Sequence, residues 1–83
     1  MAYMYILITC IPDYYVGSAD DIDDRFRQHI SGKVKATKAK LPVQLVYKEY
    51  FRTRGEAQKR EYQIKRWKSR KLIDSLIRAI NKE

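Results

Sequence analysis

The chain has 83 residues, and its 18 lysines and arginines exceed its 10 acidic residues by a formal charge of +8 at pH 7. A chain of this length has room for one compact core, so we expect a single domain over residues 1–83. The hydrophobic share of 45% is typical of a globular protein, and no apolar run reaches the roughly 18–20 residues that span a bilayer, so neither disorder nor a membrane span is expected.

The charge is distributed unevenly. Residues 1–32 hold two arginines and five aspartates, whereas residues 33–83 hold sixteen basic and five acidic residues. A surface this basic favours a polyanionic partner such as nucleic acid, although many lysine-rich soluble proteins have a similar charge. Cys10 is the single cysteine, so no internal disulfide is possible, and without a secretion signal we expect a cytoplasmic protein.

The first predicted feature is an antiparallel hairpin. Two tyrosine-rich runs, residues 3–9 and 14–17, are typical of strands. Residues 11–13 between them, Ile-Pro-Asp, predict a turn, because proline presets φ. The hairpin would place Tyr5 and Tyr15 on neighbouring strands, and the expected function depends on both hydroxyls facing one cleft.

A helix is expected to follow the hairpin. Gly17 either ends the second strand or lets another part of the chain approach its backbone closely. Ser18 or Asp20 can cap the helix, and Gly32 suits the position just beyond its last residue.

Three apolar residues of this helix, Ile22, Phe26 and Ile30, have helical spacing and define its predicted buried stripe. Arg25 and His29 lie four residues apart on an adjoining edge of the stripe. A guanidinium and an imidazole on one helix edge can both face a phosphate. The alternatives are an ordinary exposed helix face and a structural histidine.

The rest of the chain predicts one strand and two helices. Residues 33–40 are expected to form a basic, flexible loop. The apolar content of residues 43–51 favours a strand at the centre of the sheet, or at least one covered on both faces. A capping box of Thr53 and Glu56 predicts a helix from residue 54 to about residue 67 or 68, and Ser69 can cap a last helix from residue 70 to about residue 81. The order β-β-α-β-α-α predicts an α+β fold, in which about three helices flank a three-stranded, mostly antiparallel sheet.

Glu61 is predicted to point toward the core, since it lies between Ala57 and Ile64 on the inward stripe of its helix. A carboxylate there is costly unless it is paired, hydrogen-bonded or holding a metal. One interpretation is a partly buried salt bridge to Arg25 or to a lysine. The other is a single carboxylate ligand for Mg²⁺, which commonly uses one or two carboxylates and keeps several waters.

Taken together and in this order, these residues resemble the GIY-YIG nuclease domain, over nearly the whole chain from residue 3 to about residue 77. The positions that match the family's two triplets, its arginine and histidine, and its metal-binding glutamate are Tyr3-Met4-Tyr5, Tyr15-Val16-Gly17, Arg25, His29 and Glu61. The first triplet departs from the family pattern in having Tyr3 for glycine and Met4 for isoleucine, but Tyr5 keeps the functional hydroxyl.

The resemblance is to the small single-domain bacterial branch of the family, which is related to the amino-terminal nuclease domain found in the nuclease component of excinuclease ABC. It is carried by residues 32–37, Pro42 and residues 45–47. The relationship suggests DNA repair. A late asparagine that some members use has no clear counterpart, because Asn81, the sole asparagine, is close to the end of the sequence.

The resemblance implies a metal-dependent endonuclease that hydrolyses DNA phosphodiester bonds with one Mg²⁺ or Mn²⁺ ion. It assigns the ion to Glu61 and charge stabilisation to Arg25. It assigns removal of the proton of an attacking water to Tyr5, helped by Tyr15 or His29. A tyrosine with an ordinary pKa of ~10 is a poor base at neutral pH, so nearby positive charge is expected to lower the pKa of Tyr5.

Five basic residues are expected to contact backbone phosphates without base specificity: Lys35, Lys38, Lys40, Lys65 and Arg66. The alternatives are RNA or branched DNA as the substrate, a non-catalytic DNA- or RNA-binding module, and a nuclease domain that needs a partner protein. Because a chain of this size has no separate recognition domain, target choice would depend on surface loops, a homo-oligomer or another protein.

Overall fold

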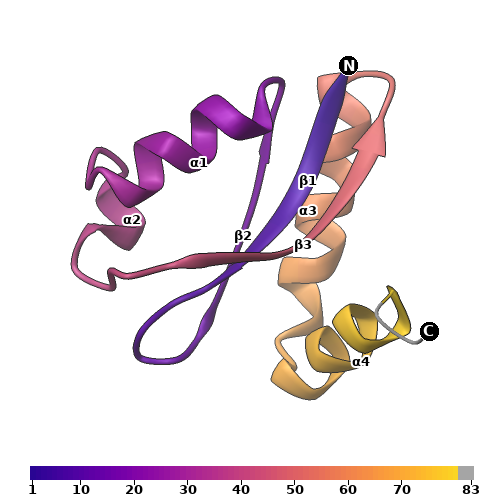
Figure 1. Cartoon of the computed structure of the whole chain (residues 1–83). Coiled ribbons are helices and arrows are strands. Elements are labelled where there is room, and N and C mark those ends of the chain that lie inside the picture. The colour runs from indigo at the N-terminus through magenta and orange to yellow at the C-terminus, as the bar shows by residue number, and fades with distance from the viewer. Residues whose placement is uncertain (81–83) are drawn as a thin grey trace.

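The computed structural model describes residues 1–80, which form one three-stranded sheet with helices on both faces (Figure 1). The elements are β1 (Ala2–Ile8), β2 (Tyr14–Ala19), α1 (Ile22–Ile30), α2 (Lys35–Lys38), β3 (Gln44–Phe51), α3 (Arg54–Trp67) and α4 (Arg70–Ile80). The predicted α+β class and element order are confirmed, but the basic segment expected to be a loop contains the short helix α2. Asn81, the predicted end of the last helix, lies outside the described residues.

Strand β1 is the centre of the sheet, and it pairs antiparallel with β2 on one side and with β3 on the other. The expectation that residues 43–51 form the central strand is therefore wrong. The physical reason is burial: five of the seven residues of β1 are buried, on both faces of the sheet, whereas Lys48 and Tyr50 of the edge strand β3 are exposed. A register shift between Ile6 and Leu7 marks an irregularity in the β1–β3 pairing.

The sheet separates two apolar clusters because alternate side chains of a strand point to opposite faces. Met4 and Ile6 of β1 pack with Ile64 of α3 on one face. Tyr5 and Leu7 pack with residues of α1 and of the segment before β3 on the other. Figure 1 shows α1 and α2 to one side of the sheet and α3 and α4 to the other. No helix within residues 1–80 has the length and apolar character needed to cross a membrane.

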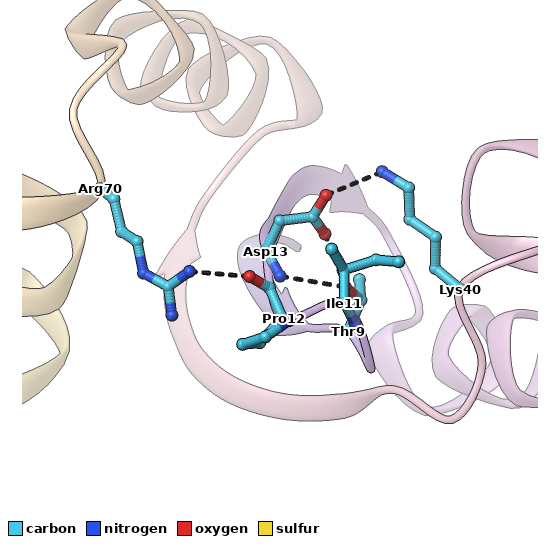
Figure 2. A network of polar contacts seen from close by, with 6 residues as sticks. All are labelled: Thr9, Ile11, Pro12, Asp13, Lys40 and Arg70. Atoms are coloured by element: carbon cyan, nitrogen blue, oxygen red, sulfur yellow. Dashed lines mark hydrogen bonds and ion pairs between the residues drawn. The ribbon is translucent and has the colours of Figure 1, made fainter.

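The hairpin turn is tied to two distant segments of the chain (Figure 2). The Asp13 backbone N–H donates to Thr9 Oγ1 at 3.1 Å, which closes the turn. Lys40 Nζ donates to Asp13 Oδ2 at 3.0 Å, and Arg70 Nη1 donates to the Pro12 carbonyl at 2.7 Å. The turn is thereby joined both to the chain before β3 and to the first residue of α4.

The ends of helix α1 are set by local hydrogen bonds. Its N-cap is Asp21, whose Oδ1 accepts the Asp24 N–H at 3.0 Å. The predicted caps Ser18 and Asp20 are wrong, because β2 continues to Ala19 and Ser18 belongs to the strand. Gly32 follows the helix with a φ of 80°, the left-handed conformation that glycine adopts readily, as predicted.

The predicted caps of helices α3 and α4 are confirmed. Thr53 Oγ1 accepts the Glu56 N–H at 3.2 Å at the start of α3, and Ser69 Oγ accepts the Leu72 N–H at 3.2 Å at the start of α4. Each bond satisfies one of the backbone donors that a helix leaves unpaired at its N-terminus.

Gly17 faces Tyr5 across the β1–β2 pairing. A Cβ atom at residue 17 would lie 2.7 Å from both Cζ and the hydroxyl oxygen of Tyr5. Glycine is thus required because the tyrosine ring lies directly against the backbone of β2. The predicted close approach is confirmed, whereas the prediction that Gly17 ends the strand is wrong.

Replacing Gly17 with alanine is expected to lower the free energy of unfolding by about 1–3 kcal/mol, because the new methyl group would overlap the buried Tyr5 ring. Urea unfolding followed by circular dichroism measures the change. Gly55→Ala is the matched control, since its Cβ would meet only Thr53 Oγ1 at 3.9 Å. Equal unfolding free energies for the two variants would contradict the tight packing at Gly17.

Candidate active site

A hydrogen bond between Tyr5 and His29 lies at the centre of the candidate site. Tyr5 Oη and His29 Nε2 are 2.8 Å apart, and the two residues are 2% and 0% exposed. Tyr5 extends from the central strand, and His29 lies in the last turn of α1, which packs against this face of the sheet. Burial, with the Arg25 charge as a second cause, lowers the pKa of His29 to about 4, so the imidazole is neutral at pH 7.

Helix α1 therefore presents a different buried face from the one expected. Ile22 and His29 are buried and Phe26 is half-buried, but Ile30 is 50% exposed. In a helix of 3.6 residues per turn, residue 29 lies about 20° from residue 22 around the helix axis, whereas residue 30 lies about 80° from it on the other side. The predicted inward position of Ile30 is wrong, and so is the alternative that Arg25 and His29 form an ordinary exposed face.

Thr37 completes the surroundings of the imidazole. Its Oγ1 lies 2.8 Å from His29 Nδ1 and 3.5 Å from the Val34 carbonyl oxygen, and Thr37 is fully buried. Sequence reasoning missed this residue because it stands among exposed lysines. The signal available was its spacing, since Val34 and Thr37 stand three residues apart, as on one helix face, in a segment otherwise made of lysines and alanines.

Arg25 is half-buried beside the pair. Its Nη1 donates to Gln28 Oε1 at 3.0 Å. Its Nε is buried and, within residues 1–80, has no hydrogen-bond partner. Interaction with the Tyr5 hydroxyl is the main cause that raises the pKa of Arg25 above its ordinary value. A buried guanidinium N–H without a partner is costly, and an anionic oxygen would satisfy it.

The pKa of Tyr5 is raised, mainly by burial, and the neighbouring Arg25 offsets only part of that effect. Arg25 thus acts in the expected direction, but the net shift of the Tyr5 pKa in the chain by itself is opposite to the expected one. The reason is that Tyr5 is enclosed by the sheet and α1, where the phenolate loses its hydration. Tyr5 keeps its proton at neutral pH, and His29 Nε2 is the atom beside it.

Tyr15 is half-buried at the rim of the same cluster. Its ring centroid lies 5.1 Å from that of His29, edge to face, and 6.4 Å from that of Tyr5. The hairpin register pairs Tyr15 with Leu7 and Tyr5 with Gly17, so the two tyrosines are diagonal neighbours on one face. The structure thus brings together four of the five candidate catalytic residues.

The fifth, Glu61, lies on α3 with 18% of its side chain exposed. Ser18 Oγ donates to Oε1 at 2.8 Å, and Lys65 Nζ donates to Oε2 at 2.6 Å. A lysine is thus its ion-pair partner, and Ser18 is a second residue that sequence reasoning missed. Glu61 is close enough to Tyr5 for its charge to contribute, as the smallest cause, to the raised pKa of that tyrosine.

The Glu61 carboxylate suits a hard divalent cation. Within residues 1–80 there is no group of three or more histidine, cysteine or acidic side chains that could enclose a metal. A single carboxylate matches a magnesium site that keeps most of its waters. Lys65 is 46% exposed and can leave Oε2 at little cost, since exposed ion pairs contribute little free energy.

The five basic residues expected to contact phosphates lie in different places. Lys35 and Lys38 are exposed on α2, beside Thr37, and Lys65 pairs with Glu61. Lys40 is half-buried and forms part of the turn network with Asp13, while Arg66 lines a separate hollow on α3 with Lys59, Tyr62, Gln63 and Trp67. They do not form one continuous cluster, because helical spacing turns Arg66 away from Glu61.

Comparison with known proteins agrees with this geometry. The family model described as the GIY-YIG catalytic domain matches residues 1–74. The chain is 46% identical over 72 residues to a UPF0213 protein, SSP2268, of Staphylococcus saprophyticus, covering 86% of this chain and 88% of that protein. It is 40% identical over 70 residues to a UPF0213 protein of Bacillus pumilus, with coverages of 83% and 71%.

A solved structure is also similar. The solution NMR structure of the UPF0213 protein BH0048 from Bacillus halodurans superimposes with a TM-score of 0.61 at 34% sequence identity, covering 95% of this chain and 85% of that one. The match of the family model over most of the sequence agrees with this shared fold. The chain therefore belongs to the GIY-YIG nuclease family, together with the small UPF0213 proteins.

Proposed function

We propose that this protein is a metal-dependent endonuclease that hydrolyses DNA phosphodiester bonds. The observation that carries the proposal is the buried Tyr5–His29 hydrogen bond, with the unpartnered Nε of Arg25 beside it. Hydrolysis of a phosphodiester needs a group that takes a proton from water and a cation that offsets charge on the phosphoryl oxygens. These three residues supply both.

Arg25 binds the scissile phosphate in this proposal. Its Nε gains the acceptor that it lacks in the chain by itself, and its charge offsets the negative charge that develops on the phosphoryl oxygens. The bound phosphate also offsets the guanidinium charge that contributes to the low pKa of His29. Substrate binding therefore makes the imidazole a better proton acceptor.

Tyr5 and His29 move the proton of the attacking water. The water gives a proton to Tyr5 Oη while the phenol gives its own proton to His29 Nε2, so no free phenolate forms in the buried site. Tyr15 packs against the imidazole and restricts its position. The leaving oxygen takes a proton from solvent, and the imidazolium returns its proton through Tyr5 to solvent, which restores the neutral imidazole.

Glu61, oriented by Ser18, is the proposed ligand for one Mg²⁺ or Mn²⁺ ion. Such an ion, when bound, polarises the scissile phosphate and stabilises the leaving oxygen. GIY-YIG nucleases generally use a divalent metal, which supports this assignment.

Glu61→Gln and Tyr5→Phe are each expected to reduce nicking of supercoiled plasmid in Mg²⁺ or Mn²⁺ by about 100-fold or more, because one removes the anionic ligand and the other the proton relay. Gel-shift affinity for the plasmid should change little. Glu56→Gln, which removes an exposed carboxylate from the same helix, is the matched control and should nick normally.

Absence of nicking by the wild type, on plasmid, branched or single-stranded DNA and on RNA, would leave the chain as a nucleic-acid-binding module. Nicking that survives Glu61→Gln would show that the metal ligand is elsewhere.

The combined variant Lys35→Ala/Lys38→Ala is expected to weaken DNA binding equally for all sequences. It should also lower the slope of log affinity against log salt by about 2, since each lysine–phosphate contact contributes about 1. Binding titrations from low to high salt measure the slope. The control Lys71→Ala/Arg78→Ala removes two exposed charges from α4 instead. Equal slopes for the two variants would exclude α2 as a phosphate-contacting surface.

The low pKa of His29 predicts a pH-dependent stability. The unfolded chain binds a proton at histidine below about pH 6.5, whereas the folded chain does so only below about pH 4. The free energy of unfolding should therefore fall as the pH is lowered from 6.5 to 4, by on the order of 3 kcal/mol. Urea unfolding at a series of pH values measures it.

His29→Gln serves as the control for this pH series, because it removes the titrating group and keeps hydrogen-bonding atoms. Its stability should be nearly flat between pH 6.5 and 4. Asp13, whose pKa is lowered mainly by the Thr9 hydrogen bond, contributes only below about pH 4. The same slope in wild type and His29→Gln would refute a neutral, buried His29.

A further inference from the structure

A chain of four polar groups runs through the buried side of α1. Tyr5 Oη lies 2.8 Å from His29 Nε2, His29 Nδ1 lies 2.8 Å from Thr37 Oγ1, and Thr37 Oγ1 lies 3.5 Å from the Val34 carbonyl oxygen. Tyr5, His29 and Thr37 are each 0–2% exposed. Because His29 and Thr37 are fully buried, their polar hydrogens must find acceptors within this row of hydrogen-bonded groups, whereas Tyr5 keeps a small exposed surface.

The Thr37 end of this hydrogen-bonded row determines where the imidazole proton lies. A neutral imidazole carries one proton, on Nδ1 or on Nε2. The Val34 carbonyl can only accept, so the hydroxyl of Thr37 donates to it and accepts from His29 Nδ1. A proton on Nδ1 leaves Nε2 bare, and the Tyr5 hydroxyl, 2.8 Å away, then donates to Nε2.

We propose that Thr37 is a positioning residue that holds His29 in the Nδ1–H tautomer and leaves Nε2 free to accept the Tyr5 proton. The catalytic consequence rests on the proposed function, whereas the tautomer is a property of the folded chain alone. Among the described residues, the Thr37 side chain is hydrogen-bonded to His29 Nδ1 and the Val34 carbonyl oxygen, so it acts on Tyr5 through the imidazole. Its side chain is presented by α2, where Thr37 is buried although the preceding residues Lys35 and Ala36 and the following residue Lys38 are exposed.

The sole histidine makes the tautomer directly measurable. Nitrogen-15 NMR of the imidazole gives one pair of ring-nitrogen signals, and their couplings to the ring protons show which nitrogen carries hydrogen. We expect the Nδ1–H form in the wild type at pH 7 and in Thr37→Ser, which keeps the hydroxyl. Thr37→Val has nearly the same shape without the acceptor and should lose this preference. The Nε2–H form in the wild type, or an unchanged tautomer in Thr37→Val, would overturn the proposal.

Activity supplies the second measurement. Thr37→Val is expected to lower the single-turnover rate of plasmid nicking by about 10- to 100-fold, part of the contribution of general-base catalysis. DNA affinity should stay within about twofold, and Thr37→Ser should restore the rate. A merely structural role would lower stability without changing the tautomer, and urea unfolding of each variant detects that case.

The two proposals fail in different ways. Absence of nicking by the wild type would refute the proposed nuclease function and, with it, the catalytic role of Thr37, while the NMR result would still decide the tautomer. Normal nicking by a folded Thr37→Val variant that has lost the Nδ1–H form would refute the positioning role and leave the nuclease function standing.

Discussion

The structure depends on burying a polar pair, Tyr5 and His29, between the central strand and α1. A phenol and an imidazole can be removed from water only if their hydrogen-bonding atoms find partners in the protein. The 2.8 Å bonds of His29 to Tyr5 and to Thr37 supply them. Gly17 makes the necessary space by letting the tyrosine ring lie against the backbone of β2. Packing of the sheet, α1 and α2 is thus coupled to the geometry of one hydrogen-bond chain.

The same burial shapes the electrostatics of the site. Burial raises the pKa of Tyr5 and lowers the pKa of His29, so both groups are neutral at pH 7. One proton is shared in the hydrogen bond between them. Arg25 is the charge placed next to them, and its buried Nε lacks a partner among the described residues. A site of two neutral proton carriers beside an unsatisfied cation is complementary to a phosphate diester, which brings the missing negative charge.

Glu61 approaches this region from the other layer of the fold. Ser18 follows Gly17 on β2, so its side chain emerges on the opposite face, where it donates to the Glu61 carboxylate of α3. The edge strand β2 therefore joins the two halves: Gly17 accommodates Tyr5 on one face, and Ser18 orients Glu61 on the other. A one-residue shift of the β1–β2 register would separate Gly17 from Tyr5 and Ser18 from Glu61, since it moves each side chain of β2 to the opposite face of the sheet.

The sequence by itself determined the α+β class, the hairpin, the element order and the caps at Thr53 and Ser69, because these follow from local periodicity and capping chemistry. It also pointed to Tyr5, Tyr15, Arg25, His29 and Glu61. Only the tertiary structure decided that β1 is central, that His29 is fully buried while Ile30 is exposed, and that Thr37 and Ser18 contact the site. These features depend on which elements pack together. A contact between residues 18 and 61, far apart in the chain, cannot be predicted from local sequence patterns. Only the tertiary structure decided that the pKa of Tyr5 is raised, because desolvation depends on the surroundings that the whole fold supplies.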